Sequence, residues 1–193
     1  MSEPMLVLGR DDHGALITHD EFATAQYDEP WRYERADGRL VVRKPADHDV
    51  QVSRSALVHH LLAYRQRCPN VVEHVFIGAW VIIDENTERI ADIGVYLKSS
   101  SGRIPERTPE LIFEVVSDES PERQRTYHEK RLEYERIGIH EYVIIDPFEG
   151  SVSVFHLNKG RYQSEHLWAL ESYSTPLLPE LAIPLIVAIP VLR

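Results

Sequence analysis

Two short apolar segments each carry a carboxylate at their centre, and this feature limits the possible folds of the chain more than any other. Residues 111–116 read LIFEVV, with Glu114 between apolar neighbours, and residues 90–97 read IADIGVYL, with Asp92 in the same setting. Short apolar runs bounded by turn residues predict buried β-strands. An isolated carboxylate buried there would cost several kcal/mol, so each acid needs a cation or a metal ion beside it.

A third charge interrupts the apolar face of the helix predicted after these strands. The residues that share this face by helical spacing are Tyr127, Lys130, Tyr134 and Ile137. Lys130 therefore either extends past the face to solvent or reaches the two carboxylates. A lysine beside Asp92 and Glu114 can orient a water molecule and stabilise a developing oxyanion. Asp92 and Glu114 offer only oxygen atoms as metal ligands, and such ligands suit Mg²⁺ or Mn²⁺.

The order of these residues resembles the PD-(D/E)XK nuclease superfamily. More specifically, the segments ADIGVY, PELIFEVVSDES and EKRLEYERIGIHEYVIIDP are similar to the Uma-two family of predicted restriction endonucleases, from about residue 18 to the C-terminal region. In that family the lysine lies on the helix after the glutamate strand, where Lys130 stands, and Val116 occupies the usual lysine position. Two residues depart from the pattern, since Ala91 replaces a proline and Gly94 interrupts a strand.

The resemblance implies a mixed α/β fold, in which a restriction-endonuclease-like central mixed sheet is flanked by helices. It also implies a metal-dependent endonuclease of restriction type that hydrolyses DNA phosphodiester bonds. Asp92 and Glu114 would hold Mg²⁺ (or Mn²⁺), with the Val115 carbonyl as a further ligand, and Lys130 would position the attacking water. DNA as substrate follows from the resemblance alone, because the residues themselves support only a carboxylate-bound divalent cation.

Two further site residues are expected in the first fifty positions. Tyr33-Glu34 followed by Asp37-Gly38 predicts a β-hairpin and matches a YE…DG element of the family. There Glu34 would assist through a water or a second ion; the alternative is a solvent-facing acid opposite an arginine. His48, at the start of a helix predicted over residues 47–67, matches a family histidine. It is an accessory candidate, with a helix cap or surface residue as the alternative.

Length and composition favour one soluble domain. We expect a flexible segment over residues 1–17 and a single domain over residues 18–193. No secretory segment is visible, and one cysteine leaves no disulfide framework, so the cytoplasm is the expected location. No apolar run is long enough for a membrane span.

The net charge of −10 counts against a DNA-binding protein, because such proteins are usually basic or carry a basic stripe. Two other functions therefore stay open: a catalytically silent binding or assembly module with a nuclease-like fold, and a metal-dependent hydrolase of RNA or nucleotides. A homodimer is expected if both strands of a duplex are to be cut.

Overall fold

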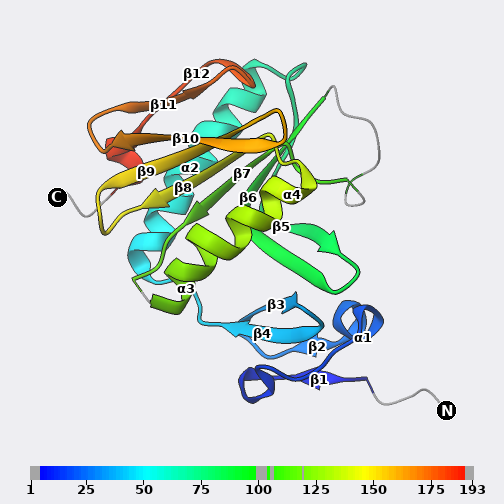
Figure 1. Ribbon diagram of the computed structural model, residues 1–193. Coiled ribbons are helices and arrows are strands. Elements are labelled where there is room, and N and C mark those ends of the chain that lie inside the picture. Colours follow the sequence, from blue (N-terminus) through cyan, green and yellow to red (C-terminus); the bar gives the residue numbers. More distant parts are fainter. Residues whose placement is uncertain (1–4, 99–103, 105–106, 119, 190–193) are drawn as a thin grey trace. The chain divides into compact units, whose positions relative to one another are not determined.

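The chain divides by its internal contacts into two compact units (Figure 1). The computed structural model describes residues 5–98, 104, 107–118 and 120–189. Each unit is formed by two stretches of chain, Met1–Ala46 with Trp80–Ile90 in the first unit, and Asp47–Ala79 with Ala91–Arg193 in the second.

The first unit contains two short strand pairs and a helix. Its elements are β1 (Val7–Leu8), α1 (His19–Thr24), β2 (Gln26–Tyr27), β3 (Arg32–Ala36) and β4 (Arg39–Arg43). Strand β1 pairs with β2 in parallel, and β3 pairs with β4 antiparallel. Asp37 and Gly38 between β3 and β4 have φ angles of 49° and 72°, as a two-residue hairpin turn requires. The predicted hairpin is confirmed.

The core of the first unit draws on residues from its whole length. Its buried members are Leu8, Ile17, Phe22, Tyr33 and Leu40. Residues 5–17 thus pack within this unit, and the flexibility expected for residues 1–17 remains a prediction for limited proteolysis to test. The single domain over 18–193 also stays a prediction, because two contact units need not fold independently.

Strands β5 (Val72–Asp84) and β6 (Thr87–Leu97) pair with each other and pass through both units. Gly78 bends β5 with a left-handed φ of 69°. The turn between β5 and β6 consists of two polar residues, Glu85 and Asn86.

The second unit is built around a mixed sheet. Its other strands are β7 (Leu111–Val115), β8 (Glu141–Asp146), β9 (Ser151–Asn158) and β10 (Arg161–Trp168). Their order is β10-β9-β8-β7-β6, with β5 also pairing β6. The β7–β8 pair is parallel, and the β6–β7, β8–β9 and β9–β10 pairs are antiparallel. A hairpin of β11 (Ser172–Thr175) and β12 (Leu178–Pro184) and the short helix α5 (Leu185–Ala188) complete the unit.

Helices cover both faces of this sheet. In Figure 1, α2 (His48–Arg67) passes behind the strands, and the segment from α3 (Ser120–Gln124) to α4 (Arg131–Ile137) passes in front of them. Asp47 caps α2 by accepting the Val50 N–H at 2.9 Å. The mixed α/β fold expected from the sequence is confirmed. Among the described residues, no helix is long and apolar enough to cross a membrane.

Candidate active site

Asp92 and Glu114 lie on neighbouring strands at the point where their pairing ends. The β6–β7 ladder runs from Val95↔Leu111 to Ile93↔Phe113. One residue beyond the last pair, a side chain takes the place of a backbone acceptor: Asp92 Oδ2 accepts the Val115 N–H at 2.9 Å. Both acids are about 1% exposed. The Asp92 carboxylate therefore contacts the residue that directly follows Glu114.

Lys130 reaches this place from the helix in front of the sheet. Its Nζ lies 2.8 Å from Glu114 Oε1, and the lysine is fully buried. The helix is π-helical over Arg125–Lys130, between α3 and α4. A π-helical turn is rare and occurs mainly at functional sites, and this one ends at the lysine that contacts the strand acid.

Arg54 supplies the second cation, and sequence reasoning missed it. Its Nη2 lies 2.5 Å from Asp92 Oδ1, and the residue is 8% exposed. The buried stripe of α2 has alternating spacings of four and three: Val50, Arg54, Leu57, Leu61 and Tyr64. Arg54 is thus a charge within an apolar helical stripe, which is the signal that singled out Lys130.

The donor set fits a hard divalent cation. Asp92 and Glu114 provide carboxylate oxygens, and the backbone N–H of Val115 is bonded to Asp92 Oδ2. Within the described part of the chain, no three His, Cys, Asp or Glu side chains form a group able to hold a metal ion. Mg²⁺ is commonly held by one or two carboxylates, with water and substrate oxygens completing its shell. Two carboxylates are therefore sufficient for this class of ion.

Glu34 and His48 are placed differently from these four residues. Glu34 belongs to the first unit and is buried, with Arg43 Nη1 at 2.9 Å and Arg89 Nη1 at 3.4 Å. The alternative expectation was a solvent-facing acid opposite an arginine. Glu34 does pair with arginines, but its side chain is buried and does not face solvent. His48 is the first residue of α2 and is exposed. Their roles in the site remain predictions.

Glu141 shows that a buried strand acid can also be structural. It accepts hydrogen bonds from the hydroxyl groups of Tyr173 and Thr175, the latter at 2.8 Å, and lies 2.9 Å from His156 Nδ1. Burial and the negative charge of Glu141 raise the pKa of Tyr173 well above its ordinary value. These contacts attach the β11–β12 hairpin to β8. Glu141 is contacted by two hydroxyl groups and a histidine, whereas Asp92 is contacted by an arginine and Glu114 by a lysine.

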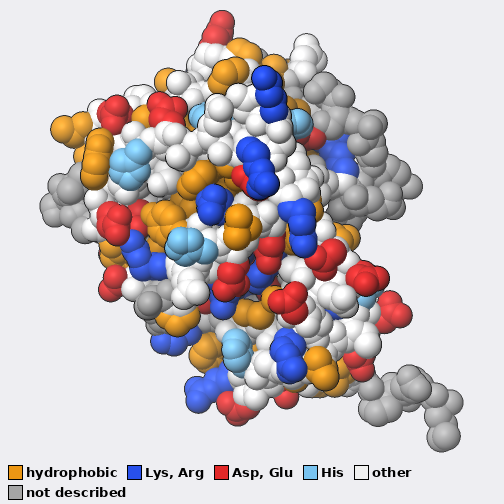
Figure 2. All heavy atoms as spheres, in the orientation of Figure 1, with side chains coloured by type: hydrophobic (Ala, Val, Ile, Leu, Met, Phe, Trp, Pro, Cys, Tyr) orange, Lys and Arg blue, Asp and Glu red, His pale blue; other side chains and the backbone are white. Residues whose placement is uncertain are grey.

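Charges of both signs are mixed on the surface. On the face drawn in Figure 2, Lys and Arg side chains alternate with Asp and Glu side chains over its described residues. This agrees with the net charge of −10. A nucleic acid on this face would meet local cations rather than a continuous basic stripe.

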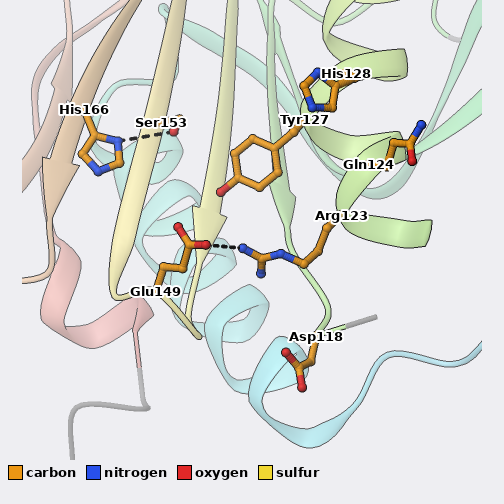
Figure 3. Close-up of a pocket in the computed structure, with 8 residues that line it drawn as sticks. All are labelled: Asp118, Arg123, Gln124, Tyr127, His128, Glu149, Ser153 and His166. Carbon is orange, nitrogen blue, oxygen red and sulfur yellow. Dashed lines mark hydrogen bonds and ion pairs between the residues drawn. The ribbon is translucent and has the colours of Figure 1, made fainter. Parts of the chain in front are cut away.

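A polar pocket of about 700 Å³ lies beside α3 and the π-helical segment (Figure 3). Its lining consists of Asp118, Arg123, Gln124, Tyr127, His128, Glu149, Ser153 and His166. Arg123 Nη2 contacts Asp146 Oδ2 and Glu149 Oε1, both at 2.6 Å. Burial and the neighbouring Asp146 raise the pKa of Tyr127. None of the predicted site residues lines this pocket.

Asp146, the last residue of β8, closes a turn. Its Oδ1 accepts the backbone N–H groups of Phe148 at 3.1 Å and Glu149 at 3.0 Å. With Oδ2 held by Arg123 and by Tyr127, this acid has a structural environment.

Comparison with known proteins gives two findings. The model of the Uma2 family, described as "Putative restriction endonuclease", matches residues 19–188. A solved structure from Anabaena variabilis ATCC 29413, described as a "putative nuclease belonging to DUF820", has a TM-score of 0.73 and 19% sequence identity. The similarity covers 92% of this chain and 99% of that one, and at this identity it shows the fold alone. A search of curated proteins found no match.

Proposed function

This chain belongs to the Uma2 family, and on that premise we propose that it is a divalent-metal-dependent endonuclease that hydrolyses DNA phosphodiester bonds. The observation that carries the proposal is the buried contact of 2.8 Å between Lys130 and Glu114. Asp92 accepts a hydrogen bond from the backbone N–H of Val115, the residue next to Glu114. Buried charges at such density are costly for a purely structural role, and they are typical of catalytic sites.

In this proposal, Asp92, Glu114 and the Val115 carbonyl hold Mg²⁺ or Mn²⁺. The bound ion would supply Lewis-acid polarisation of a phosphoryl oxygen and a water of lowered pKa. Lys130, which lies 2.8 Å from Glu114, would position the attacking water and stabilise the negative charge that develops on the phosphorus oxygens. Glu34 would assist through a water or second ion, and His48 is an accessory candidate.

The test is nicking of supercoiled plasmid in Mg²⁺ or Mn²⁺, compared with EDTA. We expect the wild type to nick, and Asp92→Ala and Lys130→Ala each to lose about 10²-fold or more, the usual contribution of a positioned group. Glu129→Ala and Lys98→Ala are matched controls, since both side chains are exposed and Glu129 is adjacent to Lys130. Equal nicking by all proteins, or none by the wild type, would contradict the proposal.

A silent module is the second candidate, and Arg54 is the observation that favours it. Arg54 contacts Asp92 and Lys130 contacts Glu114, so each carboxylate already has a basic side chain beside it. A module without turnover would bind a duplex equally well with Mg²⁺ or EDTA and leave it uncut. A panel of duplex DNA, single-stranded RNA and nucleotides under the same conditions separates an RNA or nucleotide hydrolase from the DNA endonuclease.

A further inference from the structure

Arg54 occupies the carboxylate that the proposed function assigns to a metal ion. Its Nη2 lies 2.5 Å from Asp92 Oδ1, while Asp92 Oδ2 accepts the Val115 N–H. A charge-assisted bond of this length is strong. A divalent cation at Asp92 would therefore meet a guanidinium already bound to one of the two oxygen atoms.

The guanidinium is only partly satisfied where it lies. Its Nε is buried and has no hydrogen-bond partner among the described residues. The side chain is 10% exposed, compared with 0% for Lys130, which holds Glu114. A buried donor without a partner makes the position of its side chain less stable. Arg54 is thus held mainly by one carboxylate, and its position depends on the charge of Asp92.

We propose that Arg54 is a positioning residue that holds the Asp92 carboxylate in the metal-free protein and competes with divalent cations for it. The proposal rests on the proposed function, because it needs a metal site at Asp92. In the resting protein, Arg54 holds the buried Asp92 side chain at the end of the β6–β7 ladder. This contact lowers the affinity for a metal ion. A cation that enters the site must break the contact between Arg54 and Asp92 and is then repelled by the nearby guanidinium.

Metal affinity gives a test that does not depend on turnover. Mn²⁺ is titrated by calorimetry into the full chain without DNA, for the wild type, Arg54→Gln, Arg54→Lys and Asp92→Asn. We expect Arg54→Gln to bind Mn²⁺ about tenfold or more tightly than the wild type, because a positive charge beside the ion is removed. Arg54→Lys keeps the charge and should stay within about threefold of the wild type. Asp92→Asn should abolish the binding.

A gain of affinity separates this role from a structural one, because damage to the fold weakens a metal site. Arg107→Gln is the matched control: Arg107 is also about one-tenth exposed and pairs with Glu73 at 3.1 Å, away from Asp92. It should leave Mn²⁺ affinity unchanged. Thermal unfolding with and without Mn²⁺ adds a second readout, in which Arg54→Gln should melt lower than the wild type without metal and gain more on its addition. If Arg54→Gln does not fold, Arg54→Met replaces it with the same expectation.

The outcomes are distinguishable. If the wild type binds Mn²⁺ through Asp92 and Arg54→Gln binds it equally or more weakly, the competition is refuted while the proposed function stands. If no protein of the set binds Mn²⁺, both the metal site and the role of Arg54 are refuted.

Discussion

At the scale of single residues, two of the buried ion pairs of the second unit differ in character. Lys130 and Glu114 are both about 0–1% exposed and 2.8 Å apart, whereas Arg54 is a tenth exposed. In a buried pair, desolvation offsets much of the attraction, but losing one partner leaves an uncompensated charge. The two members of such a pair should therefore be strongly coupled.

A double-mutant cycle tests this coupling. Lys130→Met should lower the free energy of unfolding by about 3–5 kcal/mol, because the buried Glu114 loses its ion-pair partner. Adding Glu114→Gln should restore part of that loss, since the remaining side chain is neutral. Urea unfolding in EDTA, followed by circular dichroism, gives the four values.

The pair of the exposed Arg161 and the partly buried Glu135 is the control for this cycle. Arg161 is 84% exposed and lies 2.9 Å from Glu135, so Arg161→Met should cost no more than about 1 kcal/mol. If the effects at Lys130 and Glu114 add to within about 0.5 kcal/mol, the buried pair is not coupled.

The same residues show how far sequence reasoning reaches. Asp92, Glu114 and Lys130 were found because a charge within an apolar strand or stripe is conspicuous. Arg54 follows that rule too, on a helix where Val50, Leu57, Leu61 and Tyr64 otherwise form an ordinary apolar stripe. The partners of Glu34 could not be predicted, since Arg89 lies 55 residues along the chain and spacing carries no information on such contacts.

At the scale of elements, the glycine that interrupts β6 has a packing reason. Gly94 looked like a defect in a strand interior, because glycine weakens strands. A Cβ placed there would lie 2.6 Å from Ala79 Cβ on β5 and 3.3 Å from Pro109 Cβ. Gly94 thus lets β5 approach β6 two residues from Asp92, which local sequence rules cannot anticipate.

Gly94→Ala should lower the free energy of unfolding by about 1–3 kcal/mol, the usual cost of overpacking a filled core. Adding Ala79→Gly removes the closest clash, so the double variant should regain part of the stability despite its second strand glycine. Thermal and urea unfolding measure both. A Gly94→Ala protein as stable as the wild type would show that β5 has room to move away.

The elements themselves were predicted better than their joints. The apolar runs, the Asp37-Gly38 turn and the amphipathic pattern of residues 47–67 are local signals, and the strands, hairpin and helix they predict are present. The π-helical segment Arg125–Lys130 was read as ordinary helix. A hydrophobic pattern with a period of 3.6 residues cannot reveal this wider turn, because Lys130 and Tyr134 remain four residues apart and on one face.

At the scale of the whole molecule, family membership and fold agree, while the chemistry is still a proposal. The composition is acidic, and charges of both signs are mixed on the surface. The account therefore depends on what the buried carboxylates at the β6–β7 junction hold.

The most direct measurement is the anomalous difference density of a crystal soaked in Mn²⁺. We expect one strong peak about 2 Å from carboxylate oxygens of both Asp92 and Glu114, with the Val115 carbonyl as a further ligand and Arg54 moved off Asp92. A crystal that binds Mn²⁺ elsewhere, while Arg54 still holds Asp92 and no peak lies between the two acids, would contradict the account.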